Sequence, residues 1–169
     1  MGTIYGYARI SQPKQNIERQ VRNIRREYPD AIIRQEVFTG TKVLQRKELN
    51  WILKRVKPED TIVFDSVSRM SRNADDGIKL YQELYAKGVE LVFLKEHHID
   101  TSTYKKAVDQ KIEMTGTDAD LILEGVNKYL MRLAENQIRI AFDQAQKEVD
   151  DLRGRTKEGI ETARRNGKL

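Results

Sequence analysis

The sequence of 169 residues contains no cysteine, and this absence removes several kinds of chemistry at once. It excludes disulfide bonds, zinc sites built on thiolates and catalysis by a thiol, and it agrees with a reducing cytoplasm. Histidine is nearly absent too, since the chain holds only the neighbours His97 and His98. On a strand these two side chains would point to opposite faces, which makes them a poor pair of metal ligands.

Long apolar runs are also missing. No stretch approaches the length of about 20 residues that spans a bilayer. The start, from Met1 to Tyr5, lacks the basic region and apolar core of a signal peptide, and Gly6 stands where N-myristoylation requires serine or threonine. We expect a cytoplasmic protein of bacterial type with no membrane partner.

Two further absences concern enzyme chemistry. No glycine-rich fingerprint follows the first strand-like segment, so a dinucleotide-binding enzyme is the least favoured function. No tight cluster of acidic residues is visible, although many hydrolytic nucleases use metals held by such clusters. We expect a site that requires neither a metal nor a cofactor.

Strand-like and helix-like segments alternate through the first 94 residues. Each is recognised by alternating apolar residues or by apolar residues at helical spacing. This order predicts an α/β fold with a mostly parallel sheet of four or five strands flanked by helices. The predicted strands are 3–9, 31–38, 61–64 and 89–94, and the predicted helices are 14–28, 46–56 and 73–87.

The last part of the chain predicts one long helix. No proline occurs from Asp118 to Asn166, and apolar residues recur mostly at intervals of three, four or seven. Because core helices are rarely so long, we expect part of it to project and to bury its apolar seam against another subunit. A helical hairpin is the less favoured alternative. The predicted division is an α/β core, 1–117, and a long dimerisation helix, 118–169; the segment 97–125 suggests no role.

The net charge of +5 is unevenly placed along the chain. Residues 153–169 carry +4, which leaves about +1 for the first 152 residues. Such asymmetry is typical of nucleic-acid contact, although a solvated helix face is the alternative. We expect this tail, and not the nearly neutral body, to bind DNA. Its basic residues are Arg153, Arg155, Lys157, Arg164, Arg165 and Lys168.

A serine among arginines follows the first predicted strand. Ser11 lies two residues after Arg9, so both side chains emerge on one face of an extended chain. Arg69 and Arg72 follow the third predicted strand, and one helical turn would bring them together. Arg46 opens the second predicted helix. Functional groups gather at the carboxyl ends of parallel strands, and converging guanidinium groups would repel one another unless an anion such as phosphate lay between them.

Each of these residues has a simpler explanation when it is taken alone. Ser11 would serve as a helix cap, a frequent role of serine. Arg46 would be a solvated residue in the first turn of a helix, and Arg69 and Arg72 would be surface charges near acidic neighbours. Their joint occurrence at strand ends favours a catalytic site.

Three motifs in this order resemble those of the serine recombinases, the resolvase and invertase family. The resemblance runs from about Ile4 to Gly167. One departure is Ser68, where the family usually has aspartate. The motifs are Tyr7-Ala8-Arg9-Ile10-Ser11, Gln45-Arg46-Lys47-Glu48-Leu49 and Ser68-Arg69-Met70-Ser71-Arg72.

The resemblance implies a mechanism and partners. Ser11 would attack a phosphodiester of double-stranded DNA to give a 5′-phosphoserine, and religation after strand exchange would need no ATP. Gln20 would support the site, and either Asp65 or an arginine would be the general base. The long helix would form a homodimer and place its basic end along DNA, with a tetramer in the synaptic complex. A separate DNA-recognition domain would be absent from this chain.

Two other functions are compatible with the fold. A receiver-like regulatory domain would use Asp65 at the end of the third strand, but Arg9 and Ser11 have the wrong charge for the metal that such a site needs. A non-catalytic DNA-binding and dimerisation module would keep the recombinase fold. The intact serine and arginines disfavour this second alternative.

Overall fold

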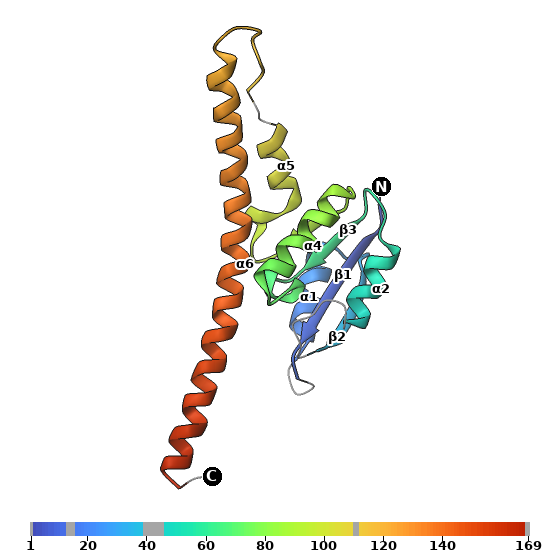
Figure 1. Cartoon of the computed structure of the whole chain (residues 1–169). Helices are drawn as coiled ribbons and strands as arrows, with labels where there is room; N and C mark the ends of the chain where they lie inside the picture. Colours follow the sequence, from blue (N-terminus) through green and yellow to red (C-terminus); the bar gives the residue numbers. More distant parts are fainter. Residues whose placement is uncertain (1, 13–15, 39–45, 110–111, 168–169) are drawn as a thin grey trace.

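A single parallel sheet forms the centre of the molecule. The computed structural model describes residues 2–12, 16–38, 46–109 and 112–167. Within them four strands lie in the order β2-β1-β3-β4, and all three strand pairs are parallel (Figure 1). The predicted α/β class and parallel sheet are therefore confirmed. The strands are β1 Ile4–Ile10, β2 Ile32–Val37, β3 Thr61–Phe64 and β4 Glu90–Phe93.

Helices connect the strands close to the predicted positions. The first helix begins at Glu18. Its predicted start at residue 14 lies outside the described residues, and the described residues 16 and 17 are not yet helical. Asn16 explains the later start, because its Oδ1 accepts a hydrogen bond from the backbone N–H of Glu18 at 2.8 Å and so competes with helical geometry. The helices are α1 Glu18–Glu27, α2 Lys47–Arg55, α3 Val67–Met70, α4 Ala74–Ala86, the 3₁₀ turn η2 His97–Ile99, α5 Thr101–Asp109 and α6 Asp120–Arg165.

The two faces of the sheet are covered unequally. On one face Tyr7 and Phe64 belong to the larger core, which also includes α2, α3, α4 and α6. On the other face, within the described residues, α1 is the helix of the smaller core and buries Ile24 near Val63. Gly6 permits this approach, since a Cβ there would lie 3.0 Å from Ile24 Cγ2. The face of α1 away from the sheet is left to solvent.

Helix α6 is one continuous helix of 46 residues, as predicted, and the hairpin alternative is wrong. At about 1.5 Å per residue it is roughly 69 Å long, and both of its ends extend beyond the body (Figure 1). Its middle part is anchored by Phe142, which is 1 % exposed and packs edge-on against Phe93. Gln146 adds a polar contact, because its Oε1 accepts the N–H of Ala74 at the start of α4. Only the middle of α6 is therefore held by the α/β layer.

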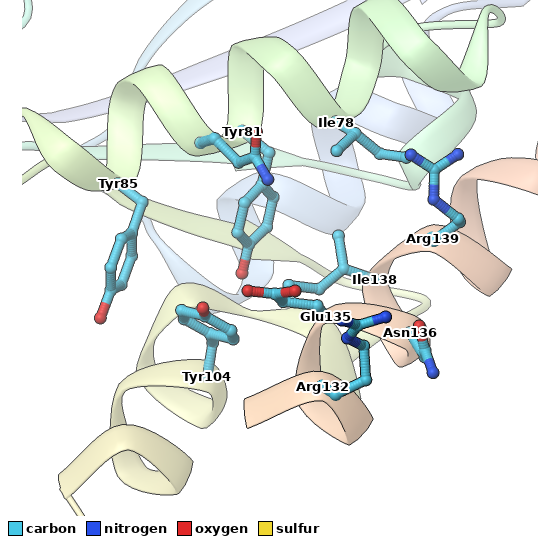
Figure 2. Close-up of a pocket in the computed structure, with 10 residues that line it drawn as sticks. Ile78, Tyr81, Tyr85, Tyr104, Arg132, Glu135, Asn136, Ile138 and Arg139 are labelled. Atoms are coloured by element: carbon cyan, nitrogen blue, oxygen red, sulfur yellow. The ribbon is translucent and has the colours of Figure 1, made fainter. Parts of the chain in front are cut away.

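A pocket of about 260 Å³ lies between α4, α5 and α6 (Figure 2). Tyr85 and Tyr104 form one wall, with their rings edge to face at 5.0 Å. Arg132 and Glu135 of α6 line the opposite side. None of the lining residues comes from the carboxyl ends of β1 or β3, so this pocket is separate from the arginine motifs.

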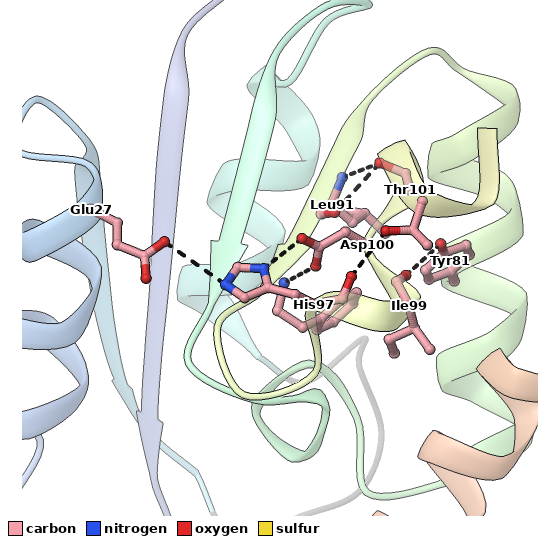
Figure 3. Close-up of polar contacts among 9 residues, drawn as sticks. Glu27, Tyr81, Leu91, His97, Ile99, Asp100 and Thr101 are labelled. Atoms are coloured by element: carbon pink, nitrogen blue, oxygen red, sulfur yellow. Dashed lines mark hydrogen bonds and ion pairs between the residues drawn. The ribbon is translucent and has the colours of Figure 1, made fainter. Parts of the chain in front are cut away.

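The segment after β4 protects the outer edge of the sheet. Asp100 Oδ1 accepts the N–H of Phe93 at 2.7 Å, and Thr101 Oγ1 accepts the N–H of Leu91 at 2.9 Å (Figure 3). His97 Nδ1 in turn lies 2.7 Å from Asp100 Oδ2. His97 and His98 both lie in η2, after the end of β4. Part of the segment without a predicted role thus covers backbone groups that would otherwise be unpaired.

Candidate active site

Ser11 lies directly beyond β1, at the carboxyl end of the sheet. Its side chain is partly exposed, and its Oγ accepts a hydrogen bond from Nη2 of Arg72. Arg72 follows α3, which itself follows β3. Because β1 and β3 are neighbours in the sheet, a serine and an arginine 61 residues apart meet at one point. A guanidinium on the serine oxygen favours the anionic form that a nucleophile needs.

Arg9 and Arg46 lie beneath this point and are completely buried. Arg9 donates to the backbone carbonyl oxygens of Ser68 at 2.7 Å, Phe38 at 3.1 Å and Arg69 at 3.4 Å. Arg46 Nη1 donates to the same carbonyl of Arg69 at 3.0 Å, and also to that of Met70. Carbonyl dipoles thus satisfy Arg9 and Nη1 of Arg46 without neutralising either charge, whereas Nε and Nη2 of Arg46 are buried with no hydrogen-bond partner among the described residues.

The burial of these charges lowers the pKa of both arginines. Desolvation is the largest cause that lowers the pKa of Arg9 to about 9, and the positive charges of Arg46 and Arg72 add to it. Desolvation also lowers the pKa of Arg46, while Tyr7 and Glu36 act in the opposite sense. Buried cations that lack a carboxylate in direct contact are stabilised by any anion that approaches them. The site is therefore suited to a phosphate group.

Arg69 is placed differently from the prediction. Helix α3 ends at Met70, and Ser71 is extended with φ −156° and ψ 147°, so Arg69 and Arg72 do not share a helical turn. The pKa of Arg69 is lowered by burial first; Asp65 opposes this shift, and the charge of Arg19 on α1 adds to it. The charges of Asp65 and Arg19 therefore act on Arg69, whereas Arg72 contacts the serine.

Gln20 holds the backbone of β1 at Arg9. Its Oε1 accepts the N–H of Arg9 at 2.9 Å, and its Nε2 donates to the C=O of Arg9 at 2.7 Å. Pairing of β1 with β3 ends at Tyr7 and Phe64, so the Gln20 amide occupies the place that the next peptide of β3 would take. A primary amide can do this because it carries both a donor and an acceptor, as a peptide does.

Asp65 directly follows β3 and is fully buried. Its Oδ1 accepts from Asn23 Nδ2 at 3.0 Å, and its Oδ2 lies 3.3 Å from Lys95 Nζ. Its polar contacts are therefore with α1 and the end of β4. Ser68, which replaces the usual aspartate, shares a hydrogen bond of 2.7 Å between its Oγ and that of Ser66.

The basic tail forms the last turns of α6 and is open to solvent. The side chains of Arg155, Lys157, Arg164 and Arg165 are exposed, and Arg165 pairs with Glu161 of the same helix at 2.7 Å. Arg153 lies within the helix without a described side chain, and Lys168 is outside the described residues. The tail is separate from the arginine cluster around Ser11.

Other potential sites are not found in the described part of the chain. Its histidine, aspartate and glutamate side chains form no group of three or more that could hold a metal ion. No helix there is long and apolar enough to cross a membrane.

The sequence analysis did not identify a set of hydrogen bonds that links β1, β2 and α2 through Glu36, which we call the Glu36 brace. Tyr7 donates to Glu36 Oε2, and Glu36 Oε1 accepts the N–H of Glu48 at 3.1 Å, in the first turn of α2. This brace fixes the start of α2, where Arg46 is the N-cap residue. The presence of Tyr7 in the first motif could have indicated that it has a role in the site. Its partner Glu36 on β2 belongs to no motif, so the contact could not be predicted.

Comparison with known proteins agrees with these observations. The family model described as the resolvase N-terminal domain matches residues 4–169. The Tn501 transposon resolvase of Pseudomonas aeruginosa is 33% identical over 118 residues, which cover 68% of this chain and 59% of the relative. A resolvase of Clostridium perfringens (strain 13 / Type A) is 27% identical over 98% of this chain and 74% of its own length.

A solved structure, the N-terminal catalytic domain of TP901-1 integrase, is 18% identical, with a TM-score of 0.49 over 78% of this chain and 98% of that one. The chain thus spans less than two thirds of the transposon resolvase that it matches. Its matched residues 4–169 nevertheless cover the strands, the helices and all three motifs. This chain belongs to the resolvase family and carries its N-terminal domain.

Proposed function

We propose that this chain is the catalytic domain of a site-specific DNA recombinase in which Ser11 is the nucleophile. The observation that carries the proposal is the contact between Arg72 and Ser11 Oγ beside the buried pair Arg9 and Arg46. Ser11 contacts Arg72, and the positive charges of Arg46 and Arg72 both act on the buried Arg9. A DNA phosphodiester would bring an anion to this group of arginines.

In the proposed reaction Ser11 Oγ attacks the scissile phosphorus. The bond from phosphorus to Ser11 Oγ forms, the bond to the 3′ oxygen breaks, and the departing oxygen takes up a proton to become a free 3′-hydroxyl. The product is a 5′-phosphoserine, which keeps a phosphodiester in place. After strand exchange, a 3′-hydroxyl of the partner strand attacks this phosphorus and releases Ser11, so no ATP is consumed.

The residues have distinct proposed roles. Arg72 is positioned to stabilise the serine oxygen and the charge that grows on the phosphorane oxygens. Arg9 and Arg46 supply fixed positive charge from below, while Gln20 is a positioning residue that holds Arg9. Asp65 contacts Asn23 and Lys95, which supports a structural role beside Arg69 more than that of a base. Among the arginines, Arg72 is then the better candidate for the proton acceptor, because its Nη2 contacts Ser11 Oγ.

Helix α6 is proposed to join two copies of the chain and to lead its basic end onto DNA, with a tetramer at synapsis. Helix α6 exposes apolar side chains that an isolated subunit leaves in water: Leu121, Ile122, Tyr129, Leu133, Ile140 and Ile160. Sedimentation of an Ile140→Glu variant tests the pairing. An unchanged association state would contradict this use of α6.

The experiment that tests the chemistry is denaturing electrophoresis of the protein with a labelled, nicked recombination site. The nick prevents religation, so a covalent adduct accumulates. We expect an adduct with the wild type and with the control Ser68→Ala, and none with Ser11→Ala. An adduct that survives Ser11→Ala would show a different nucleophile, and binding without an adduct in the wild type would favour the non-catalytic module.

A further inference from the structure

The first 152 residues have a net charge near zero, but their basic and acidic residues are concentrated in different parts of the chain. Residues 1–56 hold 12 basic and five acidic residues, a net charge of +7, whereas residues 57–152 hold 13 basic and 19 acidic residues, a net charge of −6. Apart from Lys14 and Lys42, which lie outside the described residues, the first group belongs to β1, α1, β2, α2 and the residues beside them, at one side of the sheet. The second group builds β3, β4, α4, α5 and most of α6. Basic charge is therefore concentrated on one side of the body.

Helix α1 carries four of these 12 basic residues, together with Glu18 and Glu27. Its buried side chains are Gln20 and Ile24. At 100° per residue, the side of α1 opposite to these two is occupied mainly by arginines. All four are exposed: Arg19, Arg22, Arg25 and Arg26. The outer face of α1 is thus a row of guanidinium groups, which we call the α1 arginine row.

The α1 arginine row is little neutralised by the described residues. Arg25 donates to the carbonyl of Pro29 at 3.3 Å, and no described carboxylate lies within 4 Å of a guanidinium of the row. Glu27, on the same helix, lies instead 3.9 Å from His97. A surface hollow of about 560 Å³ lies between α1 and β2, and three of the arginines line it together with Glu18, Val21 and Gln35. The row therefore presents free donors to an open surface.

The row continues from the candidate active site. Arg19 is the neighbour of Gln20, which holds Arg9, and its charge contributes to the lowered pKa of Arg69. From Arg19 the helix rises by about 10.5 Å to Arg26, which is close to the axial length of three steps along one DNA strand at about 3.4 Å each. Side chains three or four residues apart lie about 5–6 Å from one another. This spacing suits successive phosphates of one strand.

We propose that the α1 arginine row binds the phosphate backbone of the DNA that flanks the cleaved bond. The inference rests on the proposed function, because it takes the phosphodiester at Ser11 as its starting point. It also revises the expectation that the tail alone contacts DNA. A protein partner fits less well, since the cores of protein interfaces are poor in charge and rich in aromatic side chains, and the exposed face of α1 has no aromatic residue. Arginine, unlike lysine, matches two phosphate oxygens at once.

A salt titration of DNA binding tests the proposal. The variant Arg19→Gln, Arg22→Gln, Arg26→Gln keeps side chains that favour a helix. The matched control removes the same charge from exposed lysines on the acidic side of the body: Lys79→Gln, Lys105→Gln, Lys106→Gln. Each lost phosphate contact makes the slope of log affinity against log salt shallower by about 0.9. We expect the arginine variant to lose about 2.7 from the slope and the control to lose less than about 0.9.

A second measurement locates the contact. Because the chain has no cysteine, Arg22→Cys and Lys79→Cys each accept a single photocrosslinker. We expect crosslinks from Arg22→Cys to the DNA that flanks the cleaved phosphate, and none from Lys79→Cys. Equal slopes in the two charge variants, or no crosslink from α1, would overturn the proposal. A change in self-association with an unchanged DNA slope would assign the row to a protein partner instead.

These experiments test the chemistry at Ser11 and the DNA contact of the α1 arginine row independently. Binding and crosslinking do not require cleavage, so they can be measured in the Ser11→Ala background. If the α1 arginine row contributes to the slope while the wild type forms no covalent adduct, the chemistry at Ser11 is wrong and the backbone contact stands. If the adduct forms and the slopes are equal, only the role of α1 is lost.

Discussion

Replacement of Gln20 by leucine tests how the structure holds its buried arginine. Gln20 is 2 % exposed and makes both of its hydrogen bonds to the backbone of Arg9. Leucine has a similar volume but no polar group, so Gln20→Leu leaves the N–H and the C=O of Arg9 without these partners. An unsatisfied buried group costs about 1–3 kcal/mol. With partial relaxation, two such groups should lower the free energy of unfolding by about 2–4 kcal/mol.

Thermal and urea unfolding measure this loss. For a chain of this size, 1 kcal/mol corresponds to roughly 2–4 °C in Tm, so Gln20→Leu should lower Tm by roughly 4–16 °C. The control is Arg26→Gln, an exposed change on the same helix, which should stay within about 0.5 kcal/mol of the wild type. A Tm for Gln20→Leu that matches this control would refute the idea that the amide replaces a missing strand.

Activity gives an independent readout of the same contact. If Gln20 only stabilises the fold, Gln20→Leu should cleave normally at temperatures where it is folded. If it positions Arg9, the rate of single-turnover cleavage should fall while DNA affinity changes little. Normal cleavage by the folded variant would therefore remove Gln20 from the site and leave it a structural residue.

Three further perturbations test other parts of the structure. Gly77→Ala would place a methyl group 2.4 Å from Cε1 of Phe142 and should cost about 1–3 kcal/mol in urea unfolding; a stability equal to the wild type would contradict this packing of α4 on α6. The hydrogen bond to Asp100 raises the pKa of His97. The protonated His97 therefore contributes its full stabilisation below the ordinary pKa of histidine, and this stabilisation is lost as pH rises through the raised pKa of the folded state. The wild type should therefore exceed His97→Gln in unfolding free energy by more at acid than at alkaline pH, and a constant difference would argue against it. Arg72→Ala should slow single-turnover cleavage by roughly 10²-fold or more with a smaller effect on DNA binding, and near-normal cleavage would move Arg72 out of the site.

The sequence by itself determined the elements whose pattern is local. The apolar run at 61–64 and the long seam of α6 predict their structures because hydrophobic periodicity reflects which side of an element is buried. The parallel sheet followed from the order of these elements. Ser11 could be placed at a strand end for the same reason, because its position depends only on where β1 stops.

Only the tertiary structure decided which groups meet. Arg9 and Arg46 bind backbone carbonyls of α3, and a carbonyl has no residue type that a sequence pattern could reveal. The short helix α3 and the separation of Arg69 from Arg72 depend on how the chain leaves β3, which local propensity does not fix. The +7 and −6 groups can be counted in the sequence. The fold was needed to show that they lie on different sides of the sheet, and the interaction between charges depends on the distances between them. Sequence periodicity reports burial, whereas electrostatic and hydrogen-bonding partners are set by residues far apart in the chain.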